Sequence, residues 1–107
     1  MMLNDRPFQS IRMGSKRIEM RLNDEKRRLI NIGDEIEFRH RVTGEKLLTR
    51  VCNLTKFKDF EDLYKCFDKA TLGYLKNEEA TPQDMCQYYI AADIEKYGVL
   101  AIEIEVI

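Results

Sequence analysis

Three stretches of the chain alternate hydrophobic and polar residues with a period of two, the pattern of a β-strand that buries one face. They are residues 17–22 (RIEMRL), 35–39 (EIEFR) and 99–106 (VLAIEIEV). Residues 47–54 (LLTRVCNL) predict a further strand, with hydrophobic residues on both faces. The inward residues predicted for the last strand are Leu100, Ile102, Ile104 and Val106.

Helical spacing marks two segments next to these strands. A first helix is predicted to begin at Asp5, to bury Phe8 and Ile11, and to end at Gly14. Residues 56–67 then place four aromatic residues at helical spacing, namely Phe57, Phe60, Tyr64 and Phe67. We expect these aromatic side chains to belong to the core; the alternative is a platform on which nucleobases stack.

The clearest helix start is TPQDM, at residues 81–85. Thr81 suits the N-cap, Pro82 the first helical position and Asp84 the capping box, so the expected role of Asp84 is structural. This helix is predicted to end at Gly98 and to turn three residues inward, namely Met85, Tyr89 and Ala92.

The order of these elements predicts one α+β domain over residues 1–107. Strands stand near both ends of the chain with helices between them, which favours a small, closed, mixed sheet. The chain contains no repeat and no linker rich in proline or glycine, so no internal domain boundary is predicted.

The net charge argues against one class of partner. Lysine and arginine number 18 against 19 acidic residues, a formal charge of −1, so we expect no binding of duplex DNA by bulk electrostatics. Twelve of the 18 cations nevertheless lie between residues 6 and 50, whereas acidic residues dominate the last third. An anionic partner should therefore contact the N-terminal half.

Several other kinds of site and location are disfavoured. The chain has no apolar run long enough for a membrane span and no signal core in its first ten residues, so a cytoplasmic location is the default expectation. Cys52, Cys66 and Cys86 lack the paired spacing of zinc sites and are expected to be buried free thiols. His40 is the only histidine and is expected at the surface. No metal and no cofactor are therefore expected.

The octet GSKRIEMR, residues 14–21, is the strongest candidate for a polar site. Glu19 and Arg21 share one face of a strand, and Lys16 can join them only if the chain turns at Gly14 and Ser15. Taken alone, the octet favours a solvated strand face, where an ion pair contributes ~0–1 kcal/mol. If the three side chains converge, they form a pocket that could hold a phosphate or accept from a base amine.

The octet is followed by a Gly33–Asp34 turn, the aromatic segment, the pair Tyr88–Tyr89 and the final YGVLAIEI. This order resembles the ASCH domain of the PUA-like superfamily, over residues 7–107. The resemblance implies a small mixed β-barrel with flanking helices and a cleft beside the first strand. It also implies that RNA, or a nucleotide-like or nucleoside-like small molecule, is the partner. With the family pattern present, the pocket becomes the favoured interpretation of the octet over a solvated strand face.

The ligand-binding residues predicted on this basis lie mostly in the octet. Arg39 is added because Arg39 and Arg41 share a strand face that could attract phosphate, and one of the two adjacent tyrosines should line the cleft. The full set is Gly14, Ser15, Lys16, Glu19, Arg21, Arg39 and Tyr89.

One ASCH branch resembles an amidohydrolase that removes the acetyl group of N4-acetylcytidine. Lys16 matches its lysine and Asp84 its helical glutamate, but Glu19 stands where that branch has a threonine nucleophile. A carboxylate is a weak nucleophile toward an amide, so the threonine mechanism does not transfer. The alternative to a binding module is therefore a small hydrolase of acylated nucleosides or RNA, with Glu19 or Asp84 as general base and Lys16 stabilising an oxyanion.

Overall fold

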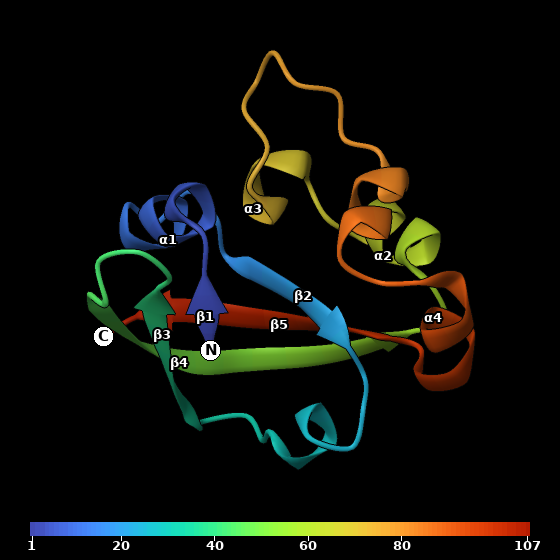
Figure 1. Ribbon diagram of the computed structural model, residues 1–107, viewed down its shortest axis with the longest axis horizontal. Coiled ribbons are helices and arrows are strands. Elements are labelled where there is room, and N and C mark those ends of the chain that lie inside the picture. The colour runs from blue at the N-terminus through green and yellow to red at the C-terminus, as the bar shows by residue number, and fades with distance from the viewer.

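The computed structural model describes residues 1–107 and contains one five-stranded sheet (Figure 1). The sheet order is β1-β3-β4-β5-β2, with β1 and β3 parallel and the other neighbours antiparallel. The strands are β1 (Met2–Leu3), β2 (Ile18–Leu22), β3 (Glu35–His40), β4 (Lys46–Phe57) and β5 (Val99–Val106). The sheet curls into a half-barrel, but β1 and β2 stand at its two edges and do not pair with each other. The predicted α+β class and the mixed sheet are confirmed, but the expected closure of the sheet is wrong, because it stays open between β1 and β2.

Most of the helical structure lies between β4 and β5, over one end of the sheet, whereas α1 covers the other end (Figure 1). The first helix, α1 (Asp5–Arg12), joins β1 to β2, and a 3-10 turn, η1 (Arg27–Leu29), lies between β2 and β3. The remaining helices are α2 (Phe60–Cys66), α3 (Lys69–Leu72), the 3-10 helix η2 (Pro82–Gln87) and α4 (Ala91–Tyr97). No helix is both long enough and apolar enough to cross a membrane.

The interior has two hydrophobic clusters. The first packs α1 against β3, β4 and β5 and includes Phe8 and Phe38, both with no exposed surface. The second packs β2 against α2, α3 and η2 around Leu63, which is also fully buried. Phe60 is buried in the second cluster, and Tyr64 and Phe67 pack against it. The core interpretation of the aromatic segment is therefore confirmed, although Phe57 ends β4 instead of starting a helix.

The predicted single helix from residue 82 to 97 is wrong in part. A 3-10 helix begins at Pro82, but the chain then breaks, and α4 starts only at Ala91. The amides of Tyr88 and Tyr89 both donate to the Met85 carbonyl, which closes the first segment. Ala92 is consequently exposed instead of inward, whereas Gly98 ends α4 as predicted.

The burial of several residues differs from expectation. Cys52, Cys66 and Cys86 are free thiols, but all three are exposed. Cys52 lies at a register shift between β4 and β5, where a bulge interrupts the inward and outward alternation. Val106 is 41% exposed because it is the last residue of its strand, whereas the other predicted inward residues of β5 are buried.

His40 is buried, which corrects the expected surface position. Its Nδ1 accepts from the amides of Val42 and Thr43, each at 3.1 Å, so the ring proton is on Nε2. Nε2 donates to Asp5 Oδ1 at 2.9 Å. His40 therefore fastens the β3–β4 turn to the start of α1, which is a structural role.

Candidate functional site

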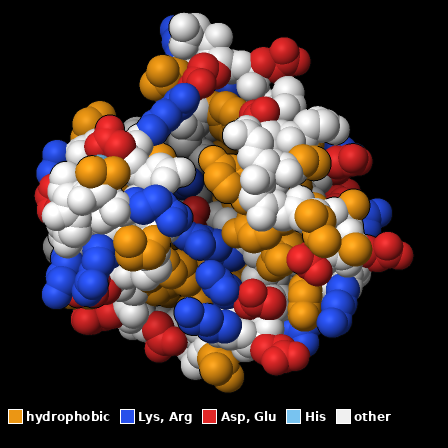
Figure 2. Space-filling model, viewed as in Figure 1, with side chains coloured by type: hydrophobic (Ala, Val, Ile, Leu, Met, Phe, Trp, Pro, Cys, Tyr) orange, Lys and Arg blue, Asp and Glu red, His pale blue; other side chains and the backbone are white.

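A pocket of about 420 Å³ opens between the two edge strands of the sheet, and 20 residues line it. Met2 and Asn4 contribute from β1 and the residue that follows it, Glu19 and Arg21 from β2, and the opposite wall comes from the connection between β4 and β5. In Figure 2, basic side chains form a band across the middle of this face, beside a hollow with hydrophobic side chains on its other side. The pocket thus occupies the place where the barrel does not close.

At this opening, some backbone N–H and C=O groups have no partner strand, and side chains form hydrogen bonds with them instead. Asn23 N donates to Gly98 O and Ile104 N donates to Arg17 O, so the odd-numbered residues of β2 bond to β5 and the Met20 amide faces the open side. That amide donates to Glu19 Oε1 at 3.2 Å. Across the opening, Arg21 Nη2 donates to the Met2 carbonyl at 3.4 Å.

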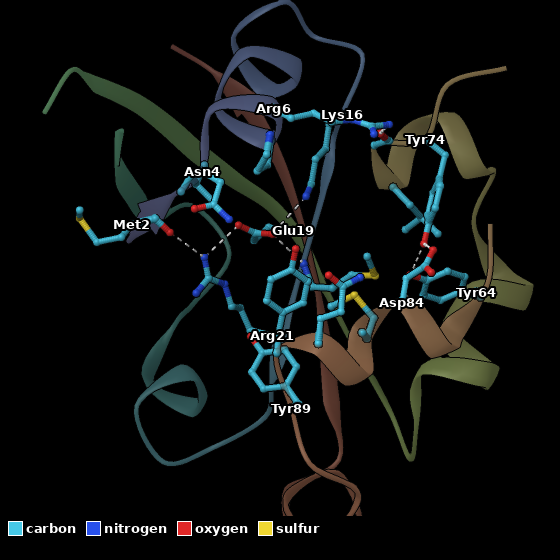
Figure 3. Close-up of a pocket in the computed structure, with 18 of the residues that line it drawn as sticks. Met2, Asn4, Arg6, Lys16, Glu19, Arg21, Tyr64, Tyr74, Asp84 and Tyr89 are labelled. Atoms are coloured by element: carbon cyan, nitrogen blue, oxygen red, sulfur yellow. Dashed lines mark hydrogen bonds and ion pairs between the residues drawn. The ribbon is translucent and has the colours of Figure 1, made fainter. Parts of the chain in front are cut away.

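Glu19 is the centre of an ion-pair group in the pocket (Figure 3). Its Oε1 lies 3.4 Å from Lys16 Nζ, and its Oε2 accepts from Arg21 Nη2 at 3.1 Å. The side chains are only 6% exposed for Glu19, 10% for Lys16 and 17% for Arg21. The octet therefore builds one shared polar centre, as required for the predicted pocket.

The electrostatics of this group keep Glu19 ionised. Burial of the carboxylate raises its pKa, but the positive charges of Lys16 and Arg21 outweigh that effect, so the pKa of Glu19 lies below its ordinary value. Burial lowers the pKa of Arg21, and the Glu19 charge more than offsets this, so Arg21 stays protonated.

We expect the protein to lose stability in acid because of Glu19. A carboxyl group whose pKa is depressed in the folded state stabilises that state above the unfolded pKa of about 4.3, and this contribution is lost as the pH falls through the folded pKa. Urea unfolding at several pH values between about 7 and 3 should show the decline. Asp5 and Glu78 also have lowered pKa values, so the matched measurement on Glu19→Gln identifies the share of Glu19. An equally steep decline in that variant would contradict the assignment.

The chain turns before β2 in the manner that the octet predicts. Gly14 has a φ of 85°, and the amides of Ser15 and Lys16 both donate to the Ser10 carbonyl at 3.1 Å. The stem of Lys16 packs against Gly73, where an added Cβ would lie 3.0 Å from Lys16 Cδ. Gly73 thus leaves the space that lets Lys16 reach Glu19.

The opposite wall carries a chain of hydroxyl groups that ends on a carboxylate (Figure 3). Tyr74 OH donates to Asp84 Oδ2 at 2.7 Å, and the hydroxyl oxygens of Tyr64 and Tyr74 are 2.9 Å apart. The predicted capping role of Asp84 is wrong, because its carboxylate binds Tyr74 and Thr81 makes no side-chain cap. Tyr89 also lines the pocket, and its ring stacks on Phe60 at 5.9 Å between centroids.

The predicted site residues divide into two sets. Five of them line the pocket: Lys16, Glu19, Arg21, Asp84 and Tyr89. Gly14 and Ser15 form the turn that positions Lys16 and do not line the pocket, and Arg39 lies exposed outside it with its guanidinium 3.5 Å from Glu37.

Sequence reasoning missed several pocket residues. Arg41, the first residue after β3, lines the pocket and donates from Nε to Asn4 Oδ1 at 3.0 Å, whereas the predicted set contained Arg39. Arg6 also lines it and pairs with Glu78. Tyr74 lies in a segment with no clear periodicity, so only its residue type could have marked it as a candidate for the pocket. No group of three or more histidine, cysteine or acidic residues is arranged to hold a metal ion.

The model of the ASCH domain family matches residues 1–107, the whole chain. The chain belongs to the ASCH domain family. This ASCH domain is similar to the crystal structure of a hypothetical protein, PH0355, with 32% identity, 99% of this chain and 95% of that chain covered, and a TM-score of 0.79. It is also similar to the solution NMR structure of protein PF0455 from Pyrococcus furiosus, with 30% identity, coverage of 100% and 98%, and a TM-score of 0.68. Neither name states an activity, and no curated protein matches the chain.

Proposed function

We propose that this ASCH domain binds RNA or a nucleotide-like ligand by holding one nucleotide in the pocket between β1 and β2. The observation that carries the proposal is the composition of the lining, because four cationic side chains and four of the chain's five tyrosines line one pocket of about 420 Å³. Pockets for small ligands typically have volumes of 300–1,000 Å³, so a nucleotide is of suitable size.

The charges support an anionic ligand. The lining contains four cations (Arg6, Lys16, Arg21 and Arg41) and three carboxylates (Glu19, Glu78 and Asp84), which leaves one excess positive charge in a protein whose net charge is −1. Glu19 and Glu78 are each paired with a cation in the free protein. Arg41 makes no ion pair, and its guanidinium is bound to the protein only through Nε, which leaves it the best placed to bind a phosphate.

The tyrosines support an aromatic ligand. Tyr88 is 61% exposed at the pocket, and Tyr89 lies beside it with 6.4 Å between the ring centroids. Stacking of a nucleobase on an aromatic side chain contributes about 1–3 kcal/mol to binding, and any of the bases can make this contact. A base among the tyrosines and a phosphate near Arg41 would use both kinds of side chain.

The test is to titrate the protein with short single-stranded RNAs and with nucleoside monophosphates. We expect Arg41→Ala to weaken binding by about tenfold, since a charge-assisted hydrogen bond to phosphate is removed. Arg39→Ala is the matched control, because Arg39 lies on the same hairpin but outside the pocket. Binding should also weaken as salt rises. Equal losses in the two variants, or no binding of any of these ligands, would reject the proposal.

A second candidate function, hydrolysis of an acylated nucleoside or of RNA, is favoured by one observation. Lys16, Glu19 and Asp84 line the same pocket, and catalysis by these three residues requires that they reach one bound substrate. Against it, Glu19 has a lowered pKa and is bound to two cations, and such a carboxylate is a weak base. Asp84 is the better candidate for the base. This candidate would be supported if the wild-type protein hydrolyses acetylated cytidine or RNA and Asp84→Asn abolishes the reaction. If the wild-type protein shows no turnover, hydrolysis is rejected and only the binding function remains.

A further inference from the structure

The hydrogen bonds of the tyrosine wall run in one direction. Asp84 Oδ2 can only accept, so the single hydroxyl proton of Tyr74 is used in the 2.7 Å bond to Asp84. Tyr64 must then be the donor in its 2.9 Å bond to the Tyr74 oxygen. Burial, together with the hydrogen bonds to Tyr64 and Asp84, raises the pKa of Tyr74, as expected for a hydroxyl that keeps its proton. The protons of both hydroxyls therefore point along the wall and not toward a ligand.

Asp84 consequently presents an unused acceptor to the pocket. Its Oδ1 has no hydrogen-bond partner, and the residue is only half-buried where it lines the cavity. The lone pairs left on the Tyr64 hydroxyl oxygen are acceptors as well. The part of the wall formed by Tyr64, Tyr74 and Asp84 therefore offers a ligand acceptors rather than donors.

The other side of the pocket has the opposite polarity. Lys16, Arg21 and Arg41 carry donors and no acceptors. The only carboxylate among them, Glu19, already receives hydrogen bonds from Arg21 and the Met20 amide and an ion pair from Lys16. Figure 3 shows this group and the Tyr74–Asp84 pair on different sides of the pocket. A ligand that fits both sides must carry an anion or acceptor at one end and an N–H donor at the other.

We propose that the pocket selects nucleotides whose base carries an exocyclic amino group, with Asp84 Oδ1 accepting from that amine and the phosphate bound on the side of Lys16, Arg21 and Arg41. This inference rests on the proposed nucleotide-binding function and adds a specificity-determining residue to it. Cytosine presents its N4 amine as a donor, whereas uracil presents the O4 acceptor at the same position. Asp84 repels that oxygen and leaves it without a partner, and so the two pyrimidines are distinguished although they have the same size.

The experiment compares cytidine 5′-monophosphate with uridine 5′-monophosphate by calorimetric titration. The two probes share the sugar and the phosphate. The wild-type protein should bind the cytidine nucleotide roughly ten- to a hundredfold more tightly, the usual range for one hydrogen bond to a charged acceptor. Asp84→Asn keeps the shape of the side chain and lets its amide donate to uracil O4, so the preference should vanish or reverse. Glu79→Gln is the control, because Glu79 lies outside the pocket and the variant removes the same charge.

The outcomes separate the inference from the function on which it rests. If neither nucleotide binds to the wild-type protein and RNA does not bind either, the proposed function fails. If both nucleotides bind the wild-type protein with equal affinity, the function stands and the selectivity is wrong, a result that needs no variant to fold. If Asp84→Asn keeps the full preference for the cytidine nucleotide, or if Glu79→Gln loses it, the role assigned to Asp84 is wrong.

Discussion

Replacing Glu19 by alanine should reduce the free energy of unfolding by about 3–5 kcal/mol, because the substitution leaves two cations in a buried site without their counter-ion. Lys16 is 10% exposed and Arg21 17% exposed, and both pair with this one carboxylate. The Met20 amide loses its acceptor as well. A domain of this size has a total stability of roughly 5–15 kcal/mol, so the change is large. Urea unfolding followed by circular dichroism measures it.

The matched control for this prediction is Glu37→Ala. Glu37 also contacts two cations on neighbouring positions of the sheet, Arg39 and Lys46, but all three side chains are about half-exposed. Its loss should change the stability by only about 0–1 kcal/mol. Equal effects of the two substitutions would show that water reaches Lys16 and Arg21 freely, and the polar centre described above would be incorrect.

Gly98→Ala should destabilise the protein by about 3 kcal/mol or more, measured by thermal or urea unfolding. Gly98 joins α4 to β5 with φ 70° and ψ −172°, a combination that is nearly restricted to glycine. An added Cβ would also lie 2.9 Å from the Phe57 carbonyl, which is backbone and cannot rotate away.

Gly44→Ala separates the two causes of the expected loss at Gly98. Gly44 has a similar φ of 75°, but no atom lies within 4 Å of the Cβ that an alanine would add. Its substitution should therefore cost only the strain of the left-handed conformation, about 1–2 kcal/mol. If Gly44→Ala proves as damaging as Gly98→Ala, the close approach to Phe57 has no part in the effect.

The alternation of hydrophobic residues predicted β2, β3 and β5 because a period of two reports directly on which face of a strand is buried. It could not predict β1, which has only two residues. Nor could it predict the break before α4, where local backbone hydrogen bonds to the Met85 carbonyl end the 3-10 helix. The same rule would place Glu19 in solvent. Glu19 is buried because helical segments and β1 cover that face of β2, which is a tertiary effect.

The candidate site was predictable to the extent that it lies within one strand and the turn before it. Lys16, Glu19 and Arg21 are close in sequence, so strand geometry and a flexible Gly14 could bring them together. The far wall depends on residues 64–89 folding back over the sheet, and no local pattern specifies which of their side chains meet. Asp84 shows this limit, because its local sequence predicts a cap and its tertiary partner is Tyr74.

A buried ion pair is seldom favoured for stability alone, since apolar residues of similar volume commonly do as well. Exchanging Lys16, Glu19 and Arg21 together for methionine, leucine and methionine would thus leave an apolar floor without orphaned charges. We therefore expect these three charged residues to serve the ligand proposed above more than the stability of the fold.

The sheet's missing β1–β2 pairing also sets how the pocket can widen. Separating two adjacent strands within a sheet breaks a row of cooperative backbone bonds, whereas here the Arg21 guanidinium alone reaches across to Met2. Movement of Arg21 breaks its hydrogen bonds to Met2 and Glu19, but it breaks no backbone pairing within the sheet. We therefore expect that ligands of different size, from a single nucleotide to the end of a longer strand, can enter through this opening while the other strands of the sheet stay paired.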